Sequence, residues 1–228
     1  MVNQSSLSEQ HSPKPSDSIP GIVHHILGAK TNEVIDRCLL SWRDQLGNDF
    51  EFNIWDDSKL SEFIFRYYRF AYDAFINARN HAEAADIGRY LVVYHFGGYY
   101  VDWDVELLDK QGFIYLSFKY PTGYMLCDPC NQTLASEYFC ASAGDPYLLN
   151  LSLDIAQLYQ SRERENLFTP SYSGPFRMRD SLAKHPNTNM KSIPVKEVFA
   201  YDYSEIRNPP SGEITAPLLH YWLHTWIS

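Results

Sequence analysis

The chain contains a single Asp-x-Asp sequence, Asp102-Trp103-Asp104. In an extended backbone, side chains at positions i and i+2 point to the same side. Two carboxylates about 7 Å apart along a strand can therefore face one hard cation and its waters. Such a cation could carry the phosphates of a nucleotide. A short Asp-x-Asp also arises by chance, so a solvated loop is the alternative interpretation.

A second pair of charged residues precedes this motif. Asp86 and Arg89 lie three residues apart on a predicted helix, where their side chains are neighbours. One interpretation is a local ion pair worth a few tenths of a kcal/mol. The other is a pair of polar groups that hold hydroxyls or a phosphate above the end of the next strand. Their apolar neighbours along the helix place the pair beside the core.

The C-terminal segment carries two histidines and two tryptophans. If it is a helix, His220 and His224 share a face and could ligate a metal. A docked aromatic segment that includes Trp222 and Trp226 is the alternative. Cys127 and Cys130 form a lone C-x-x-C. Because no second such pair follows, we expect buried or incidental thiols rather than a zinc or redox site.

The elements that must position these residues alternate between strand and helix. Residues 22–27 form a short apolar run that predicts a buried strand, in which His24 or His25 faces the core. Residues 31–46 have one apolar face and predict a helix, and residues 50–54 alternate as a strand does. This order indicates a right-handed βαβ unit and a parallel sheet.

The clearest helix in the chain covers residues 81–96 and ends at Gly97-Gly98. Residues 99–101 then predict a central strand that stops at the Asp-x-Asp motif. Open α/β sheets bind ligands at the carboxyl ends of their strands, so the motif lies where chemistry is expected. Four further regions have weaker signals: one or two helices over 59–79, short strands over 124–127 and 138–141, a helix over 146–158, and weak periodicity over 162–210.

Composition restricts the classes of partner. The chain has 228 residues and a formal net charge of −9, with no block of Lys or Arg. We therefore expect no nucleic-acid partner, because binding to a phosphate backbone needs clustered cations. Electrostatic adhesion to an anionic bilayer is disfavoured for the same reason. We expect a flexible polar tail over residues 1–18 and a single domain over 19–228. No apolar run resembles a signal peptide or a membrane span, which predicts a cytoplasmic protein.

Taken together, several segments resemble glycosyltransferase family 32, the DXD-containing sugar transferases. This family includes capsular-polysaccharide transferases, yeast-type Golgi mannosyltransferases and the clostridial glucosylating toxins. The resemblance covers about residues 19–108, with weaker echoes in 139–148, 173–175 and 220–226. Its motifs are Ile19–Leu27 (IPGIVHHIL), Ser41-Trp42, Phe52–Asp57 (FNIWDD), Ala85–Leu91 (ADIGRYL) and Gly97–Asp104 (GGYYVDWD). Glu137 is a departure, near a position where the family often has Asn.

The resemblance implies an α/β fold of GT-A type, Rossmann-like, with a mostly parallel central sheet. It also implies a nucleotide-sugar donor (a UDP- or GDP-sugar), retention of configuration at the anomeric carbon, and a divalent metal, Mn²⁺ or Mg²⁺. The implied catalytic residues are Asp102, Asp104 and Arg89, and the implied metal ligands are Asp104, Asp102 and His220. The implied donor-binding residues are Asp86, Arg89, Asp102, Thr225 and Trp226.

Three functional hypotheses follow from this resemblance. The first is a transferase that acts on a glycan or lipid-linked acceptor in surface polysaccharide synthesis, with peripheral association at the inner membrane face. The second is a secreted effector that glycosylates a host protein. The third is a non-catalytic module that binds a sugar nucleotide. Intact Asp86, Arg89, Asp102 and Asp104 favour the two catalytic hypotheses.

Overall fold

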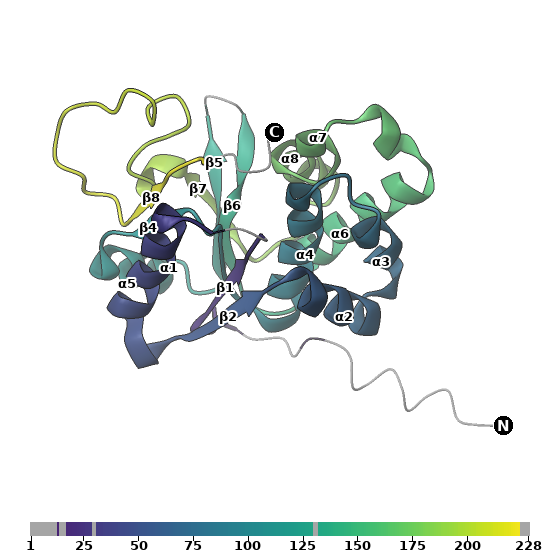
Figure 1. Ribbon diagram of the computed structural model, residues 1–228, viewed down its shortest axis with the longest axis horizontal. Coiled ribbons are helices and arrows are strands. Elements are labelled where there is room, and N and C mark those ends of the chain that lie inside the picture. The colour runs from purple at the N-terminus through teal and green to yellow at the C-terminus, as the bar shows by residue number, and fades with distance from the viewer. Residues whose placement is uncertain (1–12, 14–16, 29–30, 130–131, 224–228) are drawn as a thin grey trace.

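The computed structural model describes residues 13, 17–28, 31–129 and 132–223 (Figure 1). The strands are β1 Ile22–Ile26, β2 Glu51–Trp55, β3 Gly98–Val101, β4 Val105–Leu107, β5 Gly123–Asp128, β6 Thr133–Ala141, β7 Lys191–Pro194 and β8 Leu218–His220. The α-helices are α1 Glu33–Leu46, α2 Asp57–Tyr67, α3 Arg69–Ile76, α4 His81–Phe96, α5 Lys110–Lys119, α6 Pro146–Gln160, α7 Thr169–Tyr172 and α8 Pro175–Lys184. Short 3₁₀ turns are η1 Gly47–Asp49, η2 Glu163–Asn166 and η3 Val195–Glu197.

A six-stranded sheet in the order β2-β1-β3-β6-β5-β7 forms the centre. Strands β2 and β3 pair in parallel with β1, and β7 pairs in parallel with β5. Only β6 in this sheet runs against its neighbours β3 and β5. The predicted βαβ unit, β1-α1-β2, and the mostly parallel α/β sheet are both confirmed. A second, two-stranded sheet joins β4 to β8 in antiparallel pairing.

Helices cover both faces of the central sheet (Figure 1). Helices α2, α3, α4 and α6 pack one apolar cluster on one face. Helices α1 and α5 pack a second cluster on the other face, in which the buried rings of Trp42 and Phe113 meet edge to face 5.3 Å apart. The burial of both faces explains why β1 does not alternate between buried and exposed residues.

The two histidines of β1 are both buried, although the sequence led us to expect only one of them to face the core. Successive strand residues point to opposite faces, and here both faces are covered. His24 Nδ1 accepts a hydrogen bond from the Trp55 indole, and its Nε2 lies 2.9 Å from the Gly97 carbonyl. His24 is therefore neutral and donates through Nε2. Burial lowers the pKa of His24 and of His25 to about 4.

The junction of α4 and β3 places the Asp-x-Asp motif at the carboxyl ends of the parallel strands. Asn80 caps α4, and the helix ends at Gly97. Gly98 follows with φ +99°, and a Cβ on it would lie 2.4 Å from the Ile22 carbonyl oxygen. Only glycine allows this backbone to approach β1 so closely. Strand β3 is therefore central, with its carboxyl end open.

Three regions differ from the sequence expectations. Helix α5 lies where the sequence led us to expect only strand-like pieces after Leu108. Asp109 caps this helix, and its exposed Tyr115 and Phe118 obscure the apolar periodicity that would have predicted it. The weakly periodic stretch 162–210 contains α7, α8 and β7. His220 lies in a strand rather than in a helix, because β8 pairs with β4. Most of the predicted tail, 1–18, lies outside the described residues.

Candidate active site

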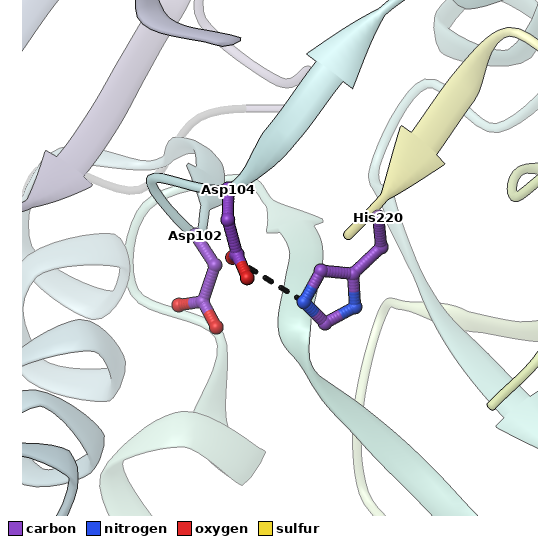
Figure 2. A group of neighbouring side chains, drawn as sticks. All are labelled: Asp102, Asp104 and His220. Carbon is purple, nitrogen blue, oxygen red and sulfur yellow. Dashed lines mark ion pairs between the residues drawn. The ribbon is translucent and has the colours of Figure 1, made fainter. Parts of the chain in front are cut away.

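The Asp-x-Asp motif forms a turn and not the extended strand that we expected. Strand β3 ends at Val101, and the Val105 amide donates to the Asp102 carbonyl over 3.2 Å, which closes a four-residue turn. One ligand atom each from Asp102, Asp104 and His220 lies within 4.8 Å of the others (Figure 2). The convergence of the two carboxylates therefore comes from the turn and the strand that follows it.

Strand β8 brings His220 to this turn. His220 stands opposite Val105 in the β4–β8 ladder, and its Nε2 is 3.3 Å from Asp104 Oδ1 (Figure 2). The Leu223 amide donates to Asp104 Oδ2 over 2.9 Å. The C-terminal segment is thus fastened directly to the motif. Of the other residues assigned to this segment, His224, Thr225 and Trp226 lie outside the described residues.

Asp104 and His220 shift each other's pKa. Burial alone would raise the pKa of Asp104, but the charge and hydrogen bond of His220 lower it below its ordinary value. Burial would lower the pKa of His220, and Asp104 raises it. The His220 Nδ1 atom is buried and has no hydrogen-bond partner, with Glu137 Oε1 the facing acid at 3.8 Å. Two carboxylates and an imidazole whose Nε2 lies beside Asp104 fit a divalent cation.

Arg89 joins helix α4 to the motif. Its Nη2 lies 3.4 Å from Asp86 Oδ1 and 3.5 Å from Asp102 Oδ1. Its Nη1 donates to the Ser136 carbonyl over 2.6 Å, and its guanidinium lies 4.5 Å from the centre of the Tyr100 ring. The local Asp86–Arg89 ion pair, one of the two interpretations that the sequence left open, is present and is half of a buried network. The network fixes the guanidinium at the end of β3.

Asp86 has a partner that the helix pattern could not reveal. The Ser173 hydroxyl, from the α7–α8 connection, donates to Asp86 Oδ2 over 2.8 Å, and the Tyr90 hydroxyl donates to the Ser173 carbonyl. Burial raises the pKa of Asp86 to about 6, against the opposing effects of Arg89 and Ser173. Ser173 was visible in the sequence only as part of a weak family echo.

The candidate site contains one cavity of about 330 Å³. It lies beyond the carboxyl end of β3, between the β6 strand, the α7–α8 connection and the segment around β8. The four assigned residues Asp86, Arg89, Asp102 and Asp104 and the assigned His220 all face it. The lining also includes Ala82, Trp103, Ser136, Glu137, Thr169, Pro170, Gly174, Pro175, Tyr203 and Trp222.

Several of these lining residues were missed by sequence reasoning. Glu137 was named only as a departure from the family and was not assigned to the site, although it is the one charged residue of β6, which is a signal that could have been used. Thr169 and Pro170 belong to the short helix α7, and Tyr203 belongs to the long segment before β8. None of these three residues lies in a segment with a recognisable sequence pattern. Among the described residues, Cys38, Cys127 and Cys140 are free thiols outside the cavity, and Cys130 is not described.

Comparison with protein families decides the character of this region. Residues 29–117 match the family model described as "Glycosyltransferase sugar-binding region containing DXD motif". This part of the chain is therefore similar to the DXD-containing region of the sugar transferases. The matched range includes Asp86, Arg89, Asp102 and Asp104, whereas His220 and Ser173 lie beyond it.

Yeast proteins show the same similarity. Inositol phosphoceramide mannosyltransferase 1 of Schizosaccharomyces pombe is 26% identical over 148 residues, which are 60% of this chain and 42% of that protein. Mannosyl phosphorylinositol ceramide synthase SUR1 of Saccharomyces cerevisiae is 31% identical over 109 residues, or 45% of this chain and 27% of that protein. The chain therefore spans less than half the length of the curated relatives that it matches.

A solved structure supports the fold. The PaToxG glycosyltransferase superposes with a TM-score of 0.57 at 17% identity, covering 78% of this chain and 73% of that chain. The expected GT-A fold is thereby confirmed. The described part of the chain holds no helix with the length and apolar character needed to cross a membrane.

Proposed function

We propose that this chain is a retaining glycosyltransferase that moves a sugar from a UDP- or GDP-sugar to an acceptor with the help of a divalent metal. One observation carries the proposal. Asp102, Asp104 and His220 converge beside the buried Arg89 in one cavity, within and beside a region that matches the DXD sugar transferases.

The charge of the cavity supports a role for a metal. Asp86, Asp102, Asp104 and Glu137 supply four carboxyl groups to the lining, and Arg89 is the one lysine or arginine among the residues that line it. Arg89 already pairs with two of those carboxyls. A donor diphosphate needs further positive charge to approach them. Mn²⁺ or Mg²⁺ held by Asp102, Asp104 and His220 would neutralise the charge that grows on the leaving diphosphate.

The buried side of the cavity suits the donor sugar. Asp86 Oδ2 is held by Ser173, and Arg89 is held by Ser136 and two carboxylates, so both groups are oriented before a ligand arrives. Preorganised polar groups of this kind bind sugar hydroxyls without having to reorganise. We assign donor-sugar binding to Asp86 and Arg89, and donor contact through the ribose or the metal to Asp102. Thr225 and Trp226 remain candidates for closing over the donor.

For the acceptor we favour a glycolipid. The names of the yeast relatives specify mannosyl transfer to inositol phosphoceramide, and we extend this class to the present chain as a proposal. Peripheral association with the inner membrane face belongs to the same proposal, because lipid-linked acceptors are held in the membrane. An acceptor glycan of a surface polysaccharide would use the same cavity.

Thermal unfolding tests the donor and the metal together. Each of a panel of UDP- and GDP-sugars is added with and without Mn²⁺ to the wild type and to Asp104→Asn. A donor at 100 times its Kd stabilises by about 2.7 kcal/mol, a shift of about 5–10 °C for this chain length. We expect a metal-dependent shift that Asp104→Asn abolishes and that the control Asp44→Asn, on the exposed face of α1, retains.

Transfer is then followed with labelled donor. Label in a lipid or glycan fraction supports the proposed acceptor class, whereas a labelled protein band supports the effector hypothesis. The anomeric configuration of the product, read by NMR, tests retention. No stabilisation by any donor, together with no donor hydrolysis, would overturn the proposal. Stabilisation by a donor without transfer to any acceptor and without donor hydrolysis would favour the non-catalytic module.

A further inference from the structure

Glu137 is a charged residue of the candidate active site to which the proposed function assigns no role beyond its charge. It lies in β6 beside the Asp-x-Asp turn, where its backbone carbonyl accepts a hydrogen bond from the Asp102 amide over 2.9 Å. Its side chain lines the cavity and is only 17% exposed. A carboxylate removed from water needs a compensating partner, because an unpaired buried charge is costly. The structure offers His220 as a partner.

The two ring nitrogens of His220 face different acids. Nε2 is 3.3 Å from Asp104 Oδ1, and Nδ1 is 3.8 Å from Glu137 Oε1. Figure 2 shows the second nitrogen on the side of the ring that is turned away from Asp104. His220 is 5% exposed, and its Nδ1 has no hydrogen-bond partner. Glu137 is therefore next to a buried polar atom that is still unsatisfied.

Aromatic packing holds the His220 ring in this orientation. The centre of the Trp222 ring lies 4.1 Å from that of His220 at an interplanar angle of 34°, and the Phe199 ring lies 5.7 Å away at 37°. The β4–β8 ladder fixes the backbone of His220 opposite Val105. Exchanging the two nitrogens would require this packing to open. Nε2 is therefore the nitrogen that the fold presents to the Asp-x-Asp turn.

The chemistry of imidazole gives the two nitrogens different roles. In the neutral ring one nitrogen carries the proton, and the other carries the lone pair that a cation needs. When Nε2 is the ligand, the proton is on Nδ1, which is buried away from water. Histidine ligands almost always donate this second N–H to a carboxylate, a carbonyl or a water molecule. A hydrogen bond needs about 2.8 Å, so Glu137 Oε1 would have to approach Nδ1 by about 1 Å.

Glu137 lies outside the cluster of candidate metal ligands. Among the described residues, the acids and histidine whose ligand atoms lie within 4.8 Å of one another are Asp102, Asp104 and His220. Glu137 contacts this cluster through the far nitrogen of His220. Its carboxylate can therefore orient a ligand without being one.

We propose that Glu137 is a positioning residue of the metal site, whose carboxylate accepts a hydrogen bond from His220 Nδ1 and holds Nε2 ready for the divalent cation beside Asp104. This inference rests on the proposed metal-dependent function and adds a residue to the same site. A hydrogen bond to an ionised acceptor is about twice as strong as one between neutral groups. It fixes the imidazole and makes its other nitrogen a stronger ligand.

The affinity for Mn²⁺, measured without turnover, tests this role. The electron paramagnetic resonance signal of free Mn²⁺ gives the Kd of the full chain, alone and with saturating UDP or GDP. Loss of such an outer carboxylate typically weakens metal binding about 10–100-fold, so we expect Kd to rise at least tenfold in Glu137→Ala. Glu137→Gln keeps the shape and a neutral acceptor oxygen, so its Kd should rise by less, about threefold.

Asp86→Asn is the matched control. It removes a carboxylate from the same cavity wall, but this carboxylate is held by Arg89 and Ser173 and not by His220. We expect its Mn²⁺ Kd to stay within twofold of the wild type. Thermal unfolding of each metal-free variant shows whether it is folded, and Glu137→Gln serves as the test where Glu137→Ala does not fold.

Proton NMR with Co²⁺ in place of Mn²⁺ follows the hydrogen bond itself. The Nδ1 proton of His220 should give a paramagnetically shifted signal that exchanges slowly with D₂O, and its absence from His220→Asn assigns it. Glu137→Ala should speed this exchange at least tenfold, whereas Glu137→Gln should give an intermediate rate. A residue that only supports the fold would leave the exchange of this proton unchanged.

Weaker Mn²⁺ binding confined to the Glu137 variants, together with faster exchange, supports the proposal. An unchanged Kd in the folded Glu137 variants, an equal loss in Asp86→Asn, or an exchange rate that does not respond to Glu137 overturns it, while the metal role of Asp102 and Asp104 stands. Failure of the proposed function is recognised separately, because the wild type then binds no Mn²⁺ with or without UDP or GDP and no donor stabilises it.

Discussion

Glu83, in the first turn of α4, is completely buried and is held by two arginines. Its Oε2 lies 2.8 Å from Arg79 Nε, and its Oε1 lies 2.7 Å from Arg164 Nη2. The Tyr172 ring contacts both guanidinium groups, at 5.8 and 5.6 Å. This cluster ties α4 to the segment that contains η2 and α7, which forms one wall of the candidate active site.

Glu83→Ala leaves two guanidinium groups side by side without their shared anion. The Arg164 side chain is only 12% exposed, so water cannot replace the carboxylate fully. Breaking a buried ion pair by removing one partner costs about 3–5 kcal/mol. Each kcal/mol shifts Tm by about 2–4 °C in a chain of this length. We therefore expect Glu83→Ala to lower Tm by about 6–20 °C.

Urea unfolding, followed by tryptophan fluorescence and by circular dichroism, measures the loss of unfolding free energy that causes this shift. Glu83→Gln keeps the shape and one acceptor oxygen, so it should lose less than Glu83→Ala. Glu62→Ala, on the exposed face of α2, is the control and should stay within about 0.5 kcal/mol of the wild type. A loss below 1 kcal/mol in Glu83→Ala would refute the view that this cluster holds the wall in place.

Three further outcomes are expected. Gly28→Ala places a Cβ 2.5 Å from the Trp103 ring, so it should displace that indole from the cavity and weaken donor affinity at least fivefold; an unchanged donor Kd contradicts this. Arg89→Ala should lower kcat/KM at least tenfold, about 1.4 kcal/mol, and an unchanged value removes Arg89 from the site. His24 has its pKa lowered by burial to about 4, so the unfolded chain binds more protons between pH 4 and 6.5. Its contribution to stability is complete above pH 6.5 and falls by about 2 kcal/mol at pH 5. The pH–stability curve of His24→Gln should lack this loss. A curve that runs parallel to that of the wild type would argue against the lowered pKa of His24.

Sequence reasoning predicted the first half of the fold well, because local patterns carry it. The apolar run of β1, the amphipathic α1, and the α4–Gly-Gly–β3 junction each report burial through spacing along one segment. The same segments hold Asp86, Arg89, Asp102 and Asp104, which explains why these residues could be named in advance. The metal-binding and donor-binding roles given to them stay predictions.

The rest of the site depends on contacts between segments that lie far apart in the chain. The meeting of His220 with Asp104 follows from the three-residue strand β8, which has no stability or recognisable period without β4. Ser173 reaches Asp86 only because α4 and α6 pack where α7 and α8 can cover them. The sequence by itself determined which residue types could do this chemistry. The tertiary structure decided which of them meet, because long-range pairing and burial leave no period in the sequence.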